Sequence, residues 1–156
     1  MTFENNEIGL SVEISGHLVD RIREAGLAHY PNEFGGILVG EYSKDKQTVK
    51  VSETILPLTY KSSKVSFDRG IDGLKESLLD FYNAVPSRIY VGEWHTHPNA
   101  SPMPSWTDIL AMRQIVAYEM VNINNPIMLI LGLTLTNSEL AFYVYLNNKL
   151  YKYENI

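Results

Sequence analysis

A ten-residue apolar run near the C-terminus, "PIMLILGLTL" at 126–135, limits the possible folds of this chain more than any other feature. Because its apolar residues do not alternate with polar ones, a strand made of this run is buried on both faces. Such a strand lies inside a sheet that is covered on both sides. The 156 residues, 45% of them hydrophobic, suffice for one core but not for two ordinary domains. We therefore expect a single domain over residues 1–156.

The spacing of apolar residues elsewhere predicts three helices separated by strands. Ser15 and Ser105 stand where helix N-caps are expected, and Pro31 and Pro86 end the first two helices. In chain order we expect a strand at 9–15, a helix at 16–30, two strands within 34–58 joined by a turn at 44–47, a helix at 72–85, a strand at 88–97, a helix from 105 to near 122, the apolar run, and strands at 140–146 and 150–154 around a turn at 147–148. This order favours an α/β sandwich with a mixed sheet.

Composition excludes several classes of function. A net charge of -5, with no dense cluster among the 13 basic residues, argues against nucleic acid as a partner. The absence of cysteine excludes disulfides, thiolate metal sites and the cysteine-ligated zinc of nucleobase deaminases, so a metal would be held by nitrogen and oxygen. The acidic N-terminus has no signal-peptide pattern, and no segment has the length of a membrane span. We therefore expect a soluble protein that binds neither nucleic acid nor membranes, and composition leaves its compartment open.

The segment "GEWHTHPNASPMPSWTD" at 92–108 holds the strongest chemical signal. Side chains alternate faces along a strand, so His95 and His97 point the same way. The loop after them contains three prolines, and it can turn the chain so that Asp108, in the first turn of the next helix, returns to the same point. Two imidazoles and one carboxylate suit Zn²⁺ and leave a fourth position for water. The segment therefore predicts a catalytic zinc site.

Each part of this segment also has a structural interpretation. An isolated His-x-His is often no more than a strand end with exposed imidazoles. Ser105 and Asp108 have the spacing of a capping box ahead of an apolar-periodic helix, and that alone explains both residues. The structural and chemical interpretations are compatible, because a capped helix start holds both side chains rigidly. His17 and His29, at either end of the first helix, are expected to be ordinary surface or capping residues.

The combination of these residues resembles the JAMM motif of the JAB/MPN metalloprotease family. That motif is a distant Glu followed by H-x-H-x7-S-x-x-D, and every element is present here once Glu33 of "NEFGGILVGEY" is included. The order of elements from about residue 10 to 154 also fits a single JAB domain. The resemblance implies a cytidine-deaminase-like three-layer sandwich, in which helices flank a mixed, curved sheet.

The resemblance also implies a role for each residue of the motif. His95, His97 and Asp108 would hold one Zn²⁺ per chain, which lowers the pKa of a bound water and polarises the scissile carbonyl. Glu33 would be the general base that carries the proton of this water to the departing amine. Ser105 would donate a hydrogen bond to the tetrahedral oxyanion.

Reasoning from the residues alone leaves the choice of base open. Glu93 lies two residues before His95, so strand alternation places it on the metal face as a rival base or as a partner that orients an imidazole. The family pattern favours Glu33. Met103, Trp106 and Phe67 are candidates to line the approach of a substrate, although packing would also explain each of them.

The phrases "GGILVGEY", "SFDRG" and "YVGEWHTHP" are similar to those of small bacterial JAB proteins, above all the deconjugating peptidases of type II CBASS antiphage operons. This resemblance implies an isopeptidase that cleaves after the C-terminus of a cGAS-like nucleotidyltransferase, which a ubiquitin-transfer-like ligase had joined to a target amine. The implied partners are that protein tail and, functionally, the ligase, in a bacterial cytoplasm. Two alternatives stay open: a peptidase that processes a sulfur-carrier or other ubiquitin-like protein, and a non-catalytic MPN-type scaffold. Scaffold domains generally lack part of the ligand set, which this chain retains in full.

Overall fold

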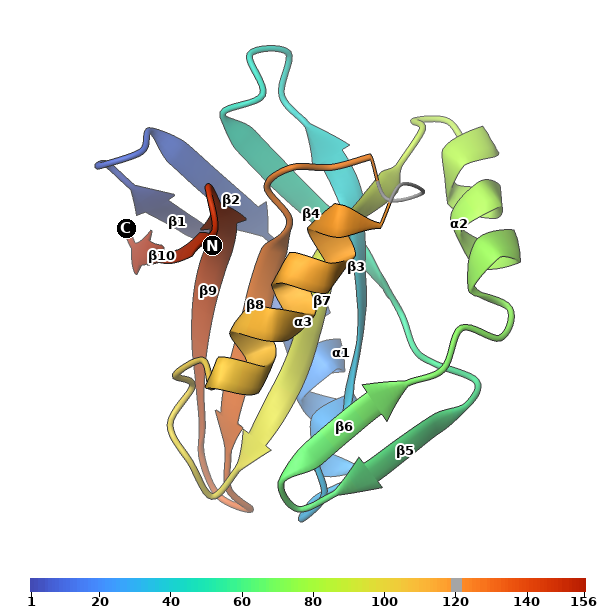
Figure 1. The fold of residues 1–156 in the computed structure, drawn as a ribbon, viewed down its shortest axis with the longest axis vertical. Coiled ribbons are helices and arrows are strands. Elements are labelled where there is room, and N and C mark those ends of the chain that lie inside the picture. Colours follow the sequence, from blue (N-terminus) through green and yellow to red (C-terminus); the bar gives the residue numbers. More distant parts are fainter. Residues whose placement is uncertain (119–121) are drawn as a thin grey trace.

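Nine strands form one mixed sheet in the computed structural model, which describes residues 1–118 and 122–156 (Figure 1). The strands are β1 (Thr2–Asn5), β2 (Leu10–Ile14), β3 (Gly35–Tyr42), β4 (Thr48–Ile55), β7 (Ile89–Pro98), β8 (Ile127–Leu133), β9 (Ser138–Leu146), β10 (Lys149–Lys152) and β11 (Glu154–Asn155). Their order in the sheet is β10-β9-β8-β7-β3-β4-β2-β1-β11. The pairs β7–β8 and β2–β4 are parallel and the other neighbours are antiparallel, so the sheet is mixed, as predicted.

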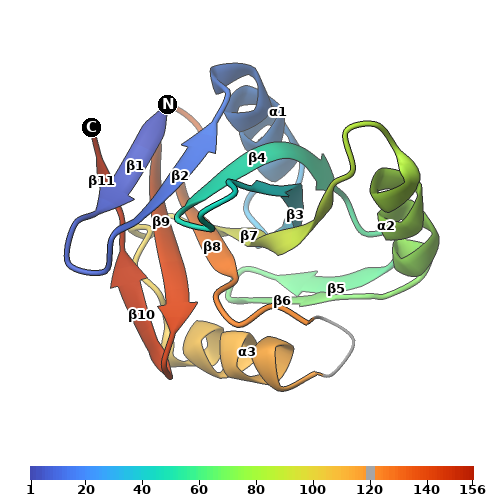
Figure 2. The ribbon, with the colours of Figure 1, turned by 90° about the horizontal axis from the view of Figure 1, so that it is seen from above.

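The sheet curls back on itself. Its two end strands, β10 and β11, are separated in the chain by Tyr153 alone, so the first and last strands of the order lie close together. The Asn5 side-chain amide, on β1, donates to the backbone carbonyl of Lys152, on β10, at 2.7 Å. Figure 2 shows this curvature from above. The predicted curved sheet is confirmed.

Helices cover both faces of the sheet, which makes three layers (Figure 2). α1 (Gly16–Leu27) buries Leu18, Val19 and Ile22 in the core on one face, together with Leu129 and Leu131 of β8. α3 (Trp106–Ala117) lies on the other face, where its Met112 packs with Met128 and Ile130 of the same strand. All seven residues of β8 are buried, as the apolar run predicts.

The predicted helix starts are confirmed by their caps. The Ser15 side chain accepts a hydrogen bond from the Leu18 backbone N–H at 3.1 Å, and Ser105 forms a capping box with Asp108. The predicted end of the last helix near residue 122 is wrong. α3 ends at Ala117 because Tyr118 already has an extended backbone, and residues 119–121 lie outside the described part of the chain.

The main element that the sequence did not predict is a hairpin of β5 (Tyr60–Ser63) and β6 (Ser66–Arg69). It forms a separate two-stranded sheet next to α2 (Leu74–Asn83) in Figure 1. Its sequence, "YKSSKVSFDR", lacks the alternation of apolar and polar residues that marks a half-buried strand. Within the described residues, no helix combines the length and the apolar character needed to cross a membrane.

Candidate metal centre

Strand β7 presents the two histidines on one face and a buried, hydrogen-bonded threonine on the other. His95 and His97 point toward α3, and their side chains are only 13% and 12% exposed. Thr96, between them, points to the opposite face and is fully buried against α1. Its hydroxyl oxygen accepts the Phe34 N–H at 3.0 Å, and its own N–H donates to the Phe34 carbonyl at 2.8 Å. Strand alternation therefore gives two imidazoles on one side and a structural anchor on the other.

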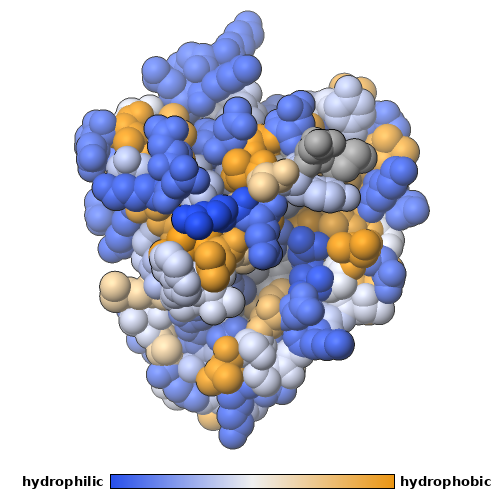
Figure 3. Space-filling view, viewed as in Figure 1, coloured by the Kyte–Doolittle hydropathy of each residue, from blue (hydrophilic) through white to orange (hydrophobic). Residues whose placement is uncertain are grey.

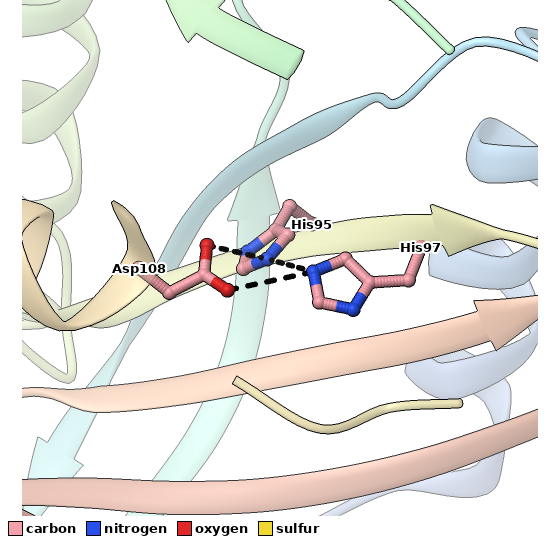
Figure 4. A group of neighbouring side chains, drawn as sticks. All are labelled: His95, His97 and Asp108. Carbon is pink, nitrogen blue, oxygen red and sulfur yellow. Dashed lines mark hydrogen bonds and ion pairs between the residues drawn. The ribbon is translucent and has the colours of Figure 1, made fainter. Parts of the chain in front are cut away.

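The N-terminus of α3 brings Asp108 to the two imidazoles (Figure 4). Its Oδ1 lies 3.1 Å from Nε2 of His95, and its Oδ2 lies 3.5 Å from Nε2 of His97. The two Nε2 atoms are 3.0 Å apart. All three ligand atoms lie within 4.8 Å of one another. The structure thus brings together the three residues that the sequence predicts as metal ligands.

The loop between β7 and α3 is held down at both ends. Asn99 takes a positive φ of 58° and donates its backbone N–H to the Leu133 carbonyl at 2.8 Å. The buried Tyr143 hydroxyl donates to the Pro102 carbonyl at 2.8 Å. A Cβ at Gly132 would lie 2.6 Å from the Ala100 carbonyl oxygen, so the close approach of loop and strand depends on this glycine. These contacts fix the turn that returns the chain to the histidines.

The three side chains fit a metal ion by their chemistry and their spacing. Two imidazole nitrogens that face each other at 3.0 Å beside a carboxylate are well placed to surround a positive charge. In a tetrahedral zinc site with bonds of about 2.0–2.1 Å, ligand atoms lie about 3.3 Å apart. The measured separations of 3.0, 3.1 and 3.5 Å bracket that spacing. Nδ1 of His97 also lies 3.2 Å from the Ser101 carbonyl, the outer contact that leaves Nε2 free for a metal.

The electrostatics of the group point the same way. Burial acts to raise the pKa of the Asp108 carboxyl, but hydrogen bonds from His95 and His97 outweigh it and hold that pKa well below its usual range. For His97, burial acts to lower the imidazole pKa, and the contact with Asp108 raises it by more. The arrangement therefore favours a positive charge at its centre, which a proton or a metal ion can supply.

Glu33 lies just outside the group of three. It precedes β3 and is two residues from Gly35, which pairs with His95 across the sheet. Burial raises the pKa of its carboxyl, and the charges of His95 and His97 lower it by less. Glu33 is not among the residues whose ligand atoms lie within 4.8 Å of one another. It is therefore a half-buried carboxyl beside the ligands and not part of their cluster.

The structure gives Ser105 a definite partner. Its hydroxyl donates to Oδ2 of Asp108 at 2.8 Å, and its backbone N–H donates to the same oxygen at 2.6 Å. The Asp108 N–H donates in return to the Ser105 hydroxyl at 3.2 Å. The capping box thus orients the carboxylate toward the histidines. Donation from Ser105 to an oxyanion would require its hydroxyl to turn away from Asp108.

Glu93 is engaged elsewhere. Nη2 of Arg69 donates to its Oε1 at 2.8 Å, and the Tyr90 hydroxyl lies 3.4 Å from the same oxygen. In the part of the chain that the structure describes, no hydrogen bond joins Glu93 to His95 or His97. Glu93 is therefore the ion-pair partner of Arg69 in this structure, and its two suggested roles at the site stay predictions.

The three substrate-lining candidates differ in their surroundings. Met103 and Trp106 are exposed and flank the start of α3, close in sequence to Asp108. Phe67 packs against Phe34, with ring centroids 5.7 Å apart, and it also borders the site. A Cβ built on Gly35 would lie 3.0 Å from both the Phe67 ring and the Cβ of His95. Figure 3 shows how apolar and polar side chains are distributed over the face that carries α3.

The sequence did not predict two side-chain contacts, the ion pair of Arg69 with Glu93 and the stacking of His29 on Phe34. Arg69 carries no local signal, because its partner Glu93 lies on another strand. His29 was expected to be a surface or capping residue. Its Nδ1 does bond the Ala25 carbonyl at the end of α1, at 2.8 Å, but its ring also stacks on Phe34. His17 is exposed, as expected.

The structure also contains a groove that lies away from His95, His97 and Asp108. A groove of about 840 Å³ is lined by Tyr42, Tyr90 and Ile89, at the end of β3 and β7 opposite to His95. None of the ligand residues lines it. The size of a groove therefore does not identify the candidate site. The cluster of metal-ligating side chains identifies it.

The fold and the site together define a class: a three-layer α/β domain with a two-histidine, one-carboxylate group that could hold a metal ion, at the end of a central strand. The solution structure of protein DSY2949 from Desulfitobacterium hafniense shares the fold, with a TM-score of 0.70 at 16% identity over 93% of this chain and 91% of that one. Residues 15–145 match the family described as prokaryotic homologs of the JAB domain. The chain belongs to this family.

Curated relatives agree with this assignment. A protein named CD-NTase/cGAS isopeptidase from Enterobacter hormaechei subsp. hoffmannii (strain UCI 50) is 35% identical over 133 residues, which is 85% of this chain and 73% of the relative. A protein of the same name from Vibrio cholerae serotype O1 (strain ATCC 39315 / El Tor Inaba N16961) is 31% identical over 78% of this chain and 76% of its own length. The probable metalloprotease y4qB of Sinorhizobium fredii (strain NBRC 101917 / NGR234) is 40% identical over 60 residues, 36% of this chain and 37% of the relative.

Proposed function

We propose that this protein is a zinc-dependent isopeptidase that hydrolyses the bond after the C-terminus of a conjugated protein, with a cGAS-like nucleotidyltransferase as the substrate. The observation that carries the proposal is the convergence of His95, His97 and Asp108 within 4.8 Å. The names and coverage of the two isopeptidase relatives support the substrate class. The proposed setting is the CBASS antiphage system of a bacterial cytoplasm, with a functional link to a ubiquitin-transfer-like ligase.

Zinc is the proposed metal because the donors are two nitrogens and one carboxylate oxygen, a set typical of catalytic zinc. His95, His97 and Asp108 would hold it. When bound there, Zn²⁺ supplies Lewis acidity, which lowers the pKa of a ligated water toward neutrality and polarises the scissile carbonyl. The rigid loop and the capping box hold the ligands in place for this purpose.

Glu33 is the proposed general base. Its carboxylate accepts a proton from the attacking water as the new carbon–oxygen bond forms. The same carboxyl then gives this proton to the amine nitrogen as the carbon–nitrogen bond breaks. The upward shift of its pKa by burial suits both steps, because a base whose pKa lies closer to neutrality also serves as an acid.

The remaining proposed roles concern the substrate. Ser105 first orients Asp108 and, after rotation of its hydroxyl, donates to the oxyanion of the tetrahedral intermediate. Met103 and Trp106, both exposed at the start of α3, provide apolar contacts for the bound tail, and Phe67 of β6, which packs against Phe34, provides a third. The proposal includes no role for nucleic acid or a membrane.

Cleavage of a fusion protein tests the proposal. A cGAS-like nucleotidyltransferase is joined through its C-terminus to a reporter and incubated with the wild type, with Glu33→Gln and with the control Glu76→Gln, an exposed residue of α2. Zinc content is measured for all three. We expect cleavage at the junction by the wild type and Glu76→Gln only, with zinc retained throughout.

Other outcomes point to the alternatives. Zinc binding with cleavage of a sulfur-carrier or ubiquitin-like fusion, but not of the nucleotidyltransferase fusion, would replace the proposed substrate. Zinc binding without cleavage of any fusion, or no zinc binding at all, would favour a scaffold. Full activity of Glu33→Gln would remove Glu33 as the base.

A further inference from the structure

Aromatic rings surround Phe34, the residue that follows the proposed base. We call the group the Phe34 cluster; it consists of His29, Phe34, Tyr60, Phe67 and Trp94. The His29 ring stacks on Phe34 with centroids 3.5 Å apart and planes 4° from parallel. The Tyr60 ring meets both of these rings edge to face, at 5.2 Å from Phe34 and 5.6 Å from His29. The cluster joins the end of α1 to the hairpin β5–β6.

Hydrogen bonds define the state of the His29 ring. Its Nδ1 lies 2.8 Å from the Ala25 carbonyl oxygen, which can only accept, so Nδ1 carries the proton. In the neutral ring, Nε2 is then an acceptor, and the Tyr60 hydroxyl at 3.0 Å donates to it. The chain Tyr60–His29–Ala25 thus connects the first residue of β5 to the last turn of α1.

The strand that begins at Tyr60 holds the backbone of Glu33. The Glu33 N–H donates to the Ser63 carbonyl at 2.8 Å. The Glu33 carbonyl accepts from the Ser62 hydroxyl. Both polar groups of this backbone unit are therefore bound to β5, whereas those of the next residue, Phe34, are bound to Thr96 of β7. The place of Glu33 between the two strands thus depends on where β5 lies relative to β7.

The same helix end is also fixed to the ligand strand. Gly26, next to Ala25, lies against Thr96, because a Cβ at Gly26 would be 2.7 Å from the Thr96 methyl group. Thr96 stands between His95 and His97. The last turn of α1 thus contacts β7 on one side and, through His29 and Tyr60, is bonded on the other side to β5, which holds the Glu33 backbone.

We infer that His29 and Tyr60 are positioning residues that set the place of Glu33 relative to the metal ligands. The inference rests on the proposed function of Glu33 as the base. Neither side chain touches the reacting atoms; they act through β5 and its two bonds to Glu33. A base displaced by a fraction of an ångström loses catalysis while substrate contacts and metal ligands stay as they were.

Removal of one hydroxyl tests the inference. Tyr60→Phe deletes the bond to His29 and keeps the ring, and since Tyr60 is 43% exposed the change adds little burial. The matched control is Tyr82→Phe, on the exposed side of α2. We expect kcat for the fusion protein to fall about tenfold in Tyr60→Phe, with KM, zinc content and melting temperature unchanged, and no change in the control.

A double variant separates positioning from packing. His29→Phe keeps a ring against Phe34 but removes both hydrogen bonds, so Tyr60→Phe added to it should cause no further loss of kcat. A purely structural role would instead lower the melting temperature and leave the kcat of the folded, zinc-loaded enzyme intact. An unchanged kcat in Tyr60→Phe, when the wild type cleaves and Glu33→Gln does not, overturns the inference and leaves the proposed function standing.

Amide hydrogen exchange tests the positioning when no fusion is cleaved. We expect Tyr60→Phe to raise the exchange rate of the Glu33 amide by about tenfold, and that of Leu129 in β8 not at all. Nitrogen-15 shifts of the His29 ring should report the proton on Nδ1. Wild-type exchange at Glu33 in the variant, or a proton on Nε2, contradicts the inference whatever the substrate.

Discussion

The contact between Gly26 and Thr96 allows a quantitative test of how tightly α1 sits on the ligand strand. A Cβ built on Gly26 lies 2.7 Å from the Thr96 methyl carbon, which is closer than side chains approach, and 3.4 Å from Leu133. Thr96 cannot easily turn away, because its hydroxyl oxygen accepts the Phe34 N–H and it is fully buried. We predict that Gly26→Ala and Thr96→Ser compensate each other.

The expected magnitudes follow from three contributions. Gly26→Ala gains about 1 kcal/mol of helix propensity but incurs about 1–3 kcal/mol of overpacking. Thr96→Ser keeps the hydroxyl for Phe34 and leaves a methyl-sized hole, at a cost of about 1 kcal/mol. In the double variant the new methyl occupies the hole, so both penalties disappear and the helix propensity remains. We expect a favourable coupling of about 2–4 kcal/mol between the two substitutions, the sum of the two penalties that the double variant removes.

Urea unfolding of the wild type, both single variants and the double variant measures this coupling. The double variant should be at least as stable as the wild type. It should melt several degrees above Thr96→Ser, since 1 kcal/mol corresponds to about 2–4 °C for a chain of this size. If the two single effects add to within about 0.5 kcal/mol, the helix does not rest on Thr96 as described and the reasoning is refuted.

Four further predictions concern the metal, the ion pair, a buried tyrosine and the helix cap. Removal of zinc by a chelator should lower the melting temperature reversibly, because free zinc at 100 times its Kd stabilises the folded state by about 2.7 kcal/mol; identical melting curves with and without zinc would exclude the site. Arg69→Met should cost about 1–2 kcal/mol in urea unfolding, because the side chains of Arg69 and Glu93 are only 19% and 21% exposed; Glu93→Gln should retain zinc and cleavage. Burial raises the pKa of Tyr42, so the neutral phenol contributes to the free energy of unfolding in full below the unfolded-state pKa of about 10, and this contribution is lost as the pH rises above that value. Tyr42→Phe should therefore reduce the fall in the free energy of unfolding between about pH 10 and 11.5. Ser105→Ala should cost about 1 kcal/mol and reduce zinc retention, whereas a loss of kcat with full zinc would indicate that the oxyanion contact is its main role.

The grouping of His95, His97 and Asp108 could be predicted because its geometry is set within one short segment. The one-residue spacing of His95 and His97 places both imidazoles on one face of any strand. The spacing of Ser105 and Asp108 caps any helix that starts there. Local rules of this kind do not depend on the rest of the fold, so the group in Figure 4 follows from residues 95–108 once the loop turns back.

The choice between Glu33 and Glu93 was different. Strand alternation places Glu93 on the metal face, and nothing in a single strand says that Arg69 will bind it. The register of β3 against β7 places Gly35 opposite His95, so Glu33 lies two residues from that pair, and its role as the base stays a prediction. Pairing between segments distant in the chain depends on both partners, and it leaves no periodic trace in either of them.

Local periodicity and capping residues were thus sufficient for the existence of the three helices, the two serine caps, the central strands and the group of His95, His97 and Asp108, because burial of one face imposes a repeat on each segment. The curl of the sheet, the polar hairpin β5–β6 and the stacking of His29 on Phe34 arise only when separate segments pack together. These contacts stabilise the fold only when two segments distant in the chain meet, so neither segment alone predicts them. For that reason the group of proposed ligands was visible in the sequence, whereas the surroundings of the proposed base were decided by the tertiary structure.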